Sequence, residues 1–178
     1  MMPVRAILLA LSGAAALLYG APVAAAPQPT DTDIKAAFLP RFARYVTWPP
    51  ATAPKAGEPF VLCVIGNQPF GTAVEAAARS QSVDGRRVVV RKLPSGSAAN
   101  GCQIAFVSGT ALQPTQQVLE AIGRKPVLTV TDDGGPRGII HFTVAGGRVR
   151  FFIDQAAARQ RGLQISSRLL ALAVGVRQ

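Results

Sequence analysis

The sequence has few of the residues that bind metals or act as nucleophiles. Its 178 residues include two cysteines, Cys63 and Cys102, and one histidine, His141. A structural zinc site takes about four ligands, and neither a CxxC nor an HExxH spacing occurs. A catalytic thiol needs a neighbouring base, but His141 lies in a separate apolar run with no evident orienting group. We therefore predict that the protein is not an enzyme and holds no metal or cofactor.

Other catalytic motifs are also missing. Ser108 follows an apolar run but does not lie in the GxSxG motif of hydrolases. The stretch IGNQPFG, residues 65–71, stands between an expected strand and an expected helix, yet lacks the GxGxxG and GK[ST] motifs of phosphate-binding loops. We interpret Gly66 as a turn, and a small anion at the following helix N-terminus is the alternative. Asp132 and Asp133 precede Gly-Gly-Pro, which is typical of an exposed turn rather than of paired catalytic carboxylates.

Long hydrophobic runs are confined to the N-terminus. Residues 6–18 are apolar, follow the single charge of Arg5 and precede a run of small residues. This order is that of a secretory signal peptide. Val23 and Ala25 fit the −3 and −1 positions of a cleavage site after Ala25. An uncleaved membrane anchor is the alternative, but the run is short for a span of about 20 residues.

This leader sets the predicted domain organisation. Residues 1–25 are expected to be a cleaved signal peptide, and residues 26–178 to form one exported domain. About 150 residues suffice for one hydrophobic core. No later window is apolar over a membrane-spanning length, so we predict no stable membrane insertion of the mature chain.

Acidic residues are scarce. The sequence has 9 Asp and Glu against 19 Lys and Arg, which gives a formal net charge of +10 at pH 7. Such a balance in a cytoplasmic protein indicates nucleic acid as a partner, but export and the dispersed basic residues argue against nucleic acid here. An acidic protein partner or an anionic membrane surface fits better. Arginine-favouring codon usage with a charged, soluble surface is the alternative explanation.

The two cysteines predict a structural disulfide. Cys63 lies within the run FVLCVIG, and Cys102 opens the run CQIAFVSG. An exported protein resides in an oxidising compartment, where paired cysteines normally form a disulfide. The bond would close a loop of about 40 residues and stabilise the fold by roughly 4 kcal/mol. This is a large share of a typical total stability of about 5–15 kcal/mol.

The pattern of apolar residues predicts an α/β fold. Buried parallel strands explain why residues 61–65 and 104–107 are apolar without alternation. Strands alternating with helices, followed by a hairpin, predict a single domain with a mixed β-sheet flanked by helices, a C-terminal β-hairpin and terminal helices. These patterns leave the strand order open. The expected strands are 60–66, 84–93 with its opening turn, 102–108, 126–133 with Asp132 and Asp133 in its turn, and the hairpin 138–144 with 148–153. The expected helices are 34–46, 69–80, 113–123, 155–162 and, after the cap Ser166, 167–174.

Several residues are expected to set the ends of the helices. Asp31 or Asp33 is placed to cap the first helix, and Asp154 and Ser166 are placed to cap the last two. Pro40 lies inside the first helical pattern. Proline lacks a backbone N–H and clashes with the preceding turn, so it should kink this helix or shift its start.

One hairpin strand carries a candidate partner-binding face. Arg148, Arg150 and Phe152 alternate with apolar residues and therefore share one side of the strand. Arginine and aromatic residues are enriched at protein interfaces and among their hot spots. We predict that these three residues contact a partner. The alternative is an ordinary half-exposed strand.

The mature chain resembles the YfiR family of periplasmic proteins. The matching stretches stand in the family's order between Asp31 and Ala173, and the last is the most specific. The resemblance implies a periplasmic α/β domain, often dimeric, whose cysteine pair corresponds to Cys63 and Cys102. The stretches are IKAAFLPRFARYVTWP, FVLCVIGNQPFG, VDGRRVVVRKL, CQIAFVS and GGRVRFFIDQAAARQRGLQISSRLLALA.

The resemblance also implies a function. The best-known members repress a membrane-bound diguanylate cyclase by touching its periplasmic sensor region, which keeps cytoplasmic cyclic-di-GMP low. An OmpA-like outer-membrane lipoprotein can sequester such a repressor. Other members sit beside sensor kinases or receptors, so the alternative function is a periplasmic sensor module that takes a small anion or aromatic metabolite near Gly66–Phe70.

The sequence departs from the family's pattern in two places. Pro40 stands where members usually have an ordinary, often aromatic, residue. No second cysteine pair follows Cys102, although some members have one. Redox switching through a second disulfide is therefore not carried over to this chain.

Overall fold

The structure is a computed structural model that describes residues 28–96 and 99–178. The predicted signal peptide, residues 1–25, lies outside the described residues. No helix in the described ranges has both the length and the apolar character needed to cross a membrane.

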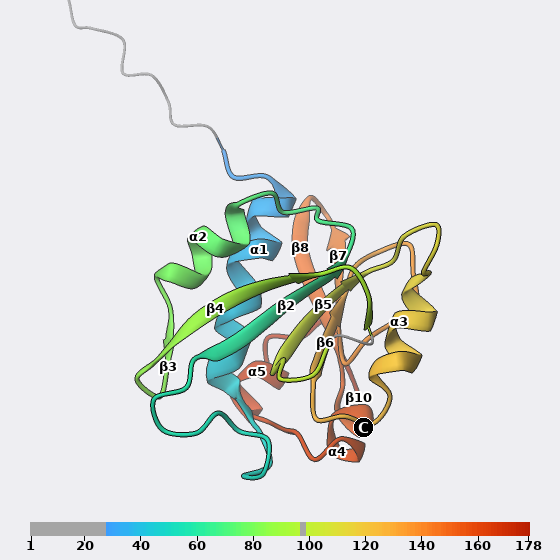
Figure 1. Cartoon of the computed structure of the whole chain (residues 1–178). Coiled ribbons are helices and arrows are strands. Elements are labelled where there is room, and N and C mark those ends of the chain that lie inside the picture. The colour runs from blue at the N-terminus through green and yellow to red at the C-terminus, as the bar shows by residue number, and fades with distance from the viewer. Residues whose placement is uncertain (1–27, 97–98) are drawn as a thin grey trace, which may run out of the picture.

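The described chain alternates helices and strands before it closes with a hairpin and short terminal elements (Figure 1). This order confirms the predicted α/β class. The elements are α1 (Asp31–Phe42), a 3-10 turn η1 (Ala43–Tyr45), β1 (Val46–Thr47), β2 (Phe60–Gly66), α2 (Ala73–Arg79), β3 (Ser82–Val83), β4 (Arg86–Leu93), β5 (Ile104–Ser108), α3 (Thr115–Ile122), β6 (Leu128–Thr131), β7 (Ile140–Ala145), β8 (Arg148–Asp154), α4 (Gln155–Gln160), β9 (Gln164–Ile165), α5 (Ser167–Leu170) and β10 (Gly175–Arg177).

The main sheet is mixed, and its strand order is β10-β8-β7-β6-β5-β2-β4-β3. The strands from β4 through β2, β5 and β6 to β7 pair in parallel, whereas the β7–β8 and β3–β4 pairs are antiparallel. Strands β5 and β6 are buried along almost their whole length, as expected for parallel strands covered on both faces. A separate antiparallel pair joins β1 to β9.

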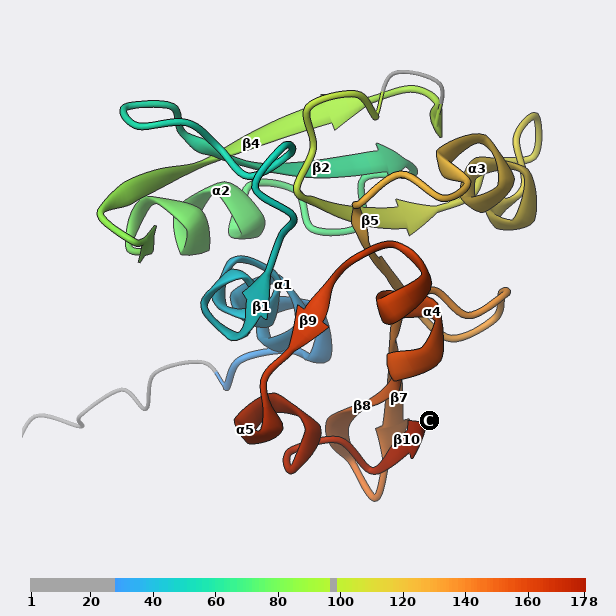
Figure 2. The same cartoon turned by 90° about the horizontal axis from the view of Figure 1, so that it is seen from below.

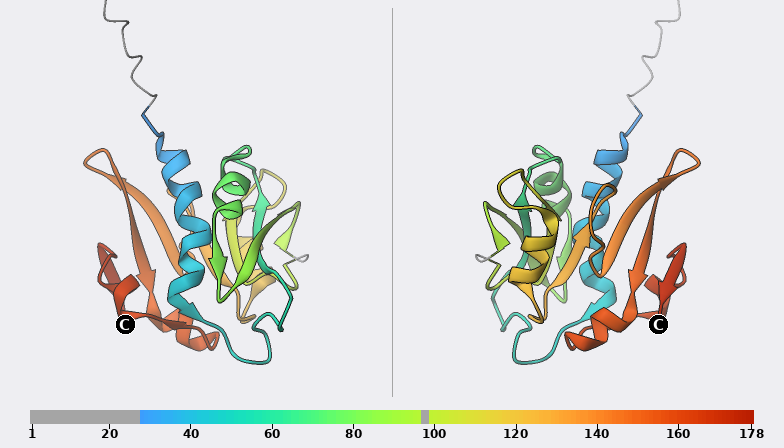
Figure 3. Two further views of the ribbon diagram at one scale, coloured as in Figure 1. Left: turned by 90° about the vertical axis from the view of Figure 1, so that its left-hand side faces the viewer. Right: turned by 90° about the vertical axis from the view of Figure 1, so that its right-hand side faces the viewer.

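The sheet curves around α1, which lies between the β2–β4 region and the β7–β8 hairpin (Figures 2 and 3). Phe42 of α1 is 1% exposed, and its ring lies 5.4 Å from Phe151 of β8 and 5.8 Å from Phe142 of β7, measured between ring centroids. Helix α2 adds Val74 and Ala78 to the same core. This apolar packing holds the hairpin against the rest of the domain.

The opposite face of the sheet is covered only in part. Val118 and Ile122 of α3 pack with Ile65 of β2 and Val107 of β5 in a second buried cluster. This cluster includes both cysteines. It ends before the hairpin, where the corresponding face of β8 carries charged residues.

The ends of the first two helices differ from the sequence-based expectation. Thr30, rather than Asp31 or Asp33, caps α1, because its hydroxyl accepts the N–H of Asp33 while the Asp33 carboxylate accepts the N–H of Thr30. Pro40 lies inside α1, which continues past it to Phe42 and then tightens into the 3-10 turn. The predicted kink at Pro40 stays a prediction. Helix α2 begins at Ala73, later than its pattern indicates.

The C-terminus also differs from the expected helix. Ser166 caps α5 as predicted, but this helix ends at Leu170. Residues Gly175–Arg177 then form β10, which pairs in parallel with Phe152–Asp154 of β8. The new strand covers only the second half of β8 and leaves the edge of Arg148–Arg150 without a paired strand in the described chain.

Candidate functional site

The side of the β7–β8 hairpin that faces away from α1 is open to solvent. We call the residues Thr143, Arg148, Arg150 and Phe152 the outer hairpin face. In the register of the hairpin Thr143 lies opposite Arg150, and Phe152 lies opposite His141. Arg148 and Arg150 are exposed and Phe152 is half-buried, whereas Phe151 and Ile153 point into the core. The structure thus places the three predicted partner-binding residues on one face, and their role in binding stays a prediction.

The outer hairpin face is basic. Neither Arg148 nor Arg150 has a carboxylate within 4.0 Å among residues 28–96 and 99–178. Asp154, the acidic residue of β8, is already engaged: one oxygen accepts the Ala157 N–H at 2.8 Å to cap α4, and the other is paired with Arg177 of β10. The two exposed guanidinium groups are therefore free to meet carboxylates of another molecule.

Phe152 is held at one end of the outer hairpin face. The guanidinium of Arg137 lies 4.7 Å from the centre of the Phe152 ring, which is the geometry of a cation–π contact. Gly175 of β10 packs beside the same ring, since a Cβ at this position would come within 2.9 Å of the ring carbon Cδ1. The alternation of β8 predicts the position of Phe152 but neither of these contacts, because Arg137 follows a Gly-Gly-Pro turn and no strand was predicted for residues 175–177.

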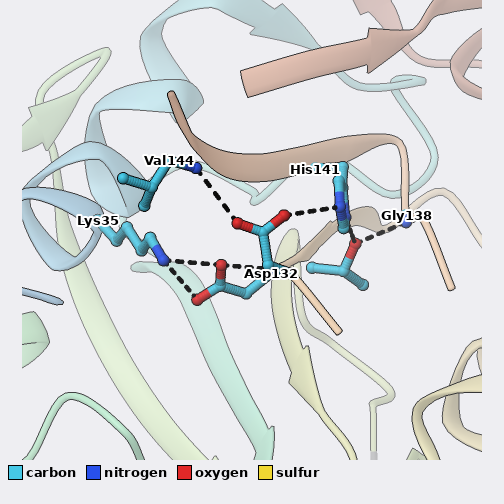
Figure 4. A network of polar contacts seen from close by, with 7 residues as sticks. Lys35, Asp132, Gly138, His141 and Val144 are labelled. Atoms are coloured by element: carbon cyan, nitrogen blue, oxygen red, sulfur yellow. Dashed lines mark hydrogen bonds and ion pairs between the residues drawn. The ribbon is translucent and has the colours of Figure 1, made fainter. Parts of the chain in front are cut away.

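A polar network fixes the base of the hairpin (Figure 4). His141 is 6% exposed, and its Nδ1 lies 2.9 Å from the hydroxyl of Thr131, which also accepts the N–H of Gly138 at 2.8 Å. The Asp133 carboxylate accepts the N–H of Val144 and lies 3.7 Å from Nε2 of His141. His141 is thus a packed strand residue, as its sequence context indicates.

Asp132 has a structural role that its turn-like sequence does not reveal. Nζ of Lys35 in α1 lies 2.7 Å and 2.9 Å from the two carboxylate oxygens of Asp132. The Lys35 side chain is only 11% exposed, so the pair ties α1 to the end of β6 in a poorly solvated place. The prediction of an exposed turn therefore holds for Asp133, which is exposed, but is wrong for Asp132.

The environment of His141 predicts a pH-dependent stability. Burial lowers the pKa of His141, and the positive charges of Arg137 and Lys35 lower it further, while Asp133 and Asp132 oppose this shift. The unfolded chain therefore takes up a proton at His141 at a higher pH than the folded chain does. As the pH falls below about 6.5, the free energy of unfolding should decrease by at most about 1.4 kcal/mol per pH unit, the slope for one proton.

Chemical denaturation of wild type and of His141→Gln between about pH 7.5 and pH 5.5 checks this expectation. The variant keeps a neutral polar side chain, so its stability should vary less with pH over this interval. Equal slopes for the two proteins would contradict the assigned burial of a neutral imidazole.

The predicted disulfide joins Cys63 of β2 to Cys102, with a Cα–Cα distance of 5.9 Å. Cys102 lies just before β5, the parallel neighbour of β2. The bond therefore links the middle of β2 to the segment just before β5. It lies inside the buried cluster beneath α3. This confirms the predicted pairing.

The loop Gly66–Phe70, proposed above as an alternative ligand site, is held against neighbouring segments of the protein by hydrogen bonds and apolar packing. The N–H of Asn67 donates to the carbonyl of Ser108, and the Asn67 side-chain amide donates to the carbonyl of Gly109. The Phe70 ring is 5% exposed and packs edge-on against Phe106, 4.6 Å away between centroids. These contacts support the interpretation of Gly66 as a turn.

No three His, Cys, Asp or Glu side chains within residues 28–96 and 99–178 gather closely enough to hold a metal ion. The carbonyl of Ser108 accepts the N–H of Asn67. Ser108 therefore has a structural role in holding the turn that follows β2. The features that distinguish the site are the exposed arginines and the rigid strands that carry them.

Comparison with known proteins identifies the family of the chain. No curated protein is significantly similar to the chain. A family model described as YfiR/HmsC-like matches residues 32–174. This range includes all but the first residue of α1, the helices α2 to α5, the disulfide and the outer hairpin face. Because the match extends over most of the sequence, the chain belongs to the YfiR/HmsC-like family.

Proposed function

We propose that this protein is a periplasmic, non-enzymatic regulator that represses an inner-membrane signalling protein, specifically a diguanylate cyclase. It binds the periplasmic sensor region of the cyclase and so lowers cytoplasmic cyclic-di-GMP. Membership of the YfiR/HmsC-like family supports this proposal. The observation on which it depends is the exposed pair Arg148 and Arg150, which has no carboxylate partner among the described residues.

The proposed mechanism is a shift of population between two states of the cyclase. A repressor that binds only the inactive state stabilises that state, by about 2.7 kcal/mol when its free concentration is a hundredfold above its dissociation constant. Sequestration of the repressor by an OmpA-like outer-membrane lipoprotein would remove this stabilisation without any chemical step. A rigid binding surface is sufficient for such a mechanism.

The structure of the outer hairpin face suggests the chemistry of the partner. Arginine guanidinium groups bind carboxylates through two parallel hydrogen bonds and lose little hydration when they do so. Phe152 supplies an apolar contact beside them. The partner surface should therefore carry Asp or Glu residues next to an apolar side chain.

A binding measurement with purified proteins tests the proposal. The mature chain is titrated into the purified periplasmic regions of candidate membrane diguanylate cyclases from the same organism, with calorimetry as the readout. Wild type should bind, and Arg148→Glu/Arg150→Glu should bind at least about tenfold more weakly, because two attractive charge contacts become repulsive.

The matched control is Arg79→Glu/Arg87→Glu. These two arginines are also exposed, but they lie on α2 and β4 at the other edge of the sheet. The control makes the same change in net charge and should bind like wild type. Unchanged affinity of Arg148→Glu/Arg150→Glu would rule out the outer hairpin face, and equal weakening of both variants would show that only the overall charge matters.

A further inference from the structure

A pocket opens where β10 pairs with β8, at one end of the outer hairpin face. Its volume is about 540 Å³, which lies within the range of about 300–1,000 Å³ that is common for small-molecule sites. The residues that matter for its chemistry are Arg137, His141, Phe152, Asp154, Val176 and Arg177.

The two arginines of the pocket differ in whether a carboxylate neutralises them. Arg177 is paired with Asp154, whose carboxylate also caps α4. Arg137 has no carboxylate within 4.0 Å and no hydrogen-bond acceptor in the part of the chain that the structure describes. Its guanidinium also lies near enough to His141 to lower the pKa of that imidazole. The pocket therefore carries one positive charge that the protein itself does not neutralise.

The guanidinium of Arg137 is positioned before any ligand arrives. It lies over the Phe152 ring at 4.7 Å, and such stacking leaves the N–H groups at the rim of the guanidinium plane free to donate. A planar guanidinium suits the two oxygens of a carboxylate. Binding would then require little further ordering of this side chain.

Beside Arg137, part of the pocket wall is apolar. Phe152 and Val176 are half-buried and line the pocket together with the backbone of Gly175. A side chain at residue 175 would collide with the Phe152 ring, so glycine keeps this ring in its place beside β10. An apolar surface next to a cation that has no carboxylate partner favours an acid that carries an apolar group over a bare inorganic anion.

We propose that this pocket binds a small organic acid, with the carboxylate on Arg137 and the apolar part against Phe152 and Val176. The proposal depends on the pocket alone and stands whether or not the partner protein is a cyclase. The site differs from the Gly66–Phe70 loop, which is closed by contacts of its own.

Titration of the mature protein with phenylacetate, followed by NMR chemical shifts, tests the proposal. Phenylacetate should bind with a dissociation constant in the millimolar range or below, and phenylacetamide, its neutral counterpart of the same shape, at least about tenfold more weakly. Arg137→Gln should weaken phenylacetate binding at least about tenfold. Arg124→Gln, which removes another exposed arginine outside the pocket, should have no effect.

Three outcomes would overturn the proposal. The first is equal binding of phenylacetate and phenylacetamide by wild type, a comparison that requires no folded variant. The second is unchanged phenylacetate binding by Arg137→Gln. The third is displacement of phenylacetate by an equal concentration of inorganic phosphate, since this would identify a site for simple anions rather than for organic acids.

Discussion

Reduction of the Cys63–Cys102 disulfide is expected to lower the free energy of unfolding by about 4 kcal/mol, because the bond closes a loop with a sequence separation of 39 residues. Both cysteines are almost fully buried, so the reduced sulfur atoms stay in the same apolar cluster and little else changes. The expected loss is a large fraction of the total stability of a domain of this size. Urea denaturation with and without a reductant, monitored by circular dichroism, measures it.

The matched control is Cys63→Ala/Cys102→Ala, whose stability should not respond to the reductant. The variant should be at least as unstable as reduced wild type, since it also loses the packing of two buried sulfur atoms. Equal stability of oxidised and reduced wild type would contradict the assigned role of the bond as the main constraint on the unfolded chain.

Gly66→Ala is expected to destabilise the domain by roughly 3 kcal/mol, since two separate costs add. Gly66 has a φ of +86°, which residues with a Cβ rarely adopt. A Cβ at this position would also overlap the carbonyl oxygen of Ser108 and approach its carbonyl carbon to 3.0 Å. That carbonyl is held in place by the N–H of Asn67 and cannot move freely. Urea denaturation again measures the loss.

Gly57→Ala separates the two costs. Gly57 has a φ of +82°, but a Cβ there would meet nothing within 4 Å. The variant should therefore lose only about 1 kcal/mol, the cost of the backbone conformation. If both variants lost the same amount, the close approach of the β2 turn to Ser108 would have no energetic importance, contrary to the structure.

Much of the fold could be predicted from local patterns. The run at β2 and the alternation in the β7–β8 hairpin identify strands because they match the periodicity of a sheet. Gly146 and Gly147 both have positive φ, as the tight turn of this hairpin requires. Asp154 and Ser166 cap their helices as predicted, because such caps act within four residues of the chain.

The features that escaped prediction are those that depend on distant contacts. The β10 strand forms because Gly175–Arg177 meets the edge of β8, and no local pattern indicates that edge. The Lys35–Asp132 pair joins residues 97 positions apart. In retrospect the apolar Val174 and Val176 on either side of Gly175 were a weak strand signal, which the preceding helical pattern concealed.

In the candidate site too, local patterns predict some features, while others depend on distant contacts. The alternation of β8 predicts that Arg148, Arg150 and Phe152 share a face, and they do. It does not predict that Arg137 lies over Phe152 or that β10 completes a pocket beside it. Those contacts arise from the curvature of the sheet and the path of the C-terminus, both of which are set by tertiary packing.

In the proposed function, the exposed pair Arg148 and Arg150 on the β7–β8 hairpin acts on a cyclase through contact alone. The most direct test is the concentration of intracellular cyclic-di-GMP in cells of the native organism from which only this protein has been deleted. Wild type and Arg79→Glu/Arg87→Glu should restore the low level when they are returned to these cells, whereas Arg148→Glu/Arg150→Glu should leave it several-fold higher at equal abundance. Deletion of the protein without any rise in cyclic-di-GMP, or full restoration by the Arg148→Glu/Arg150→Glu variant, would contradict the account.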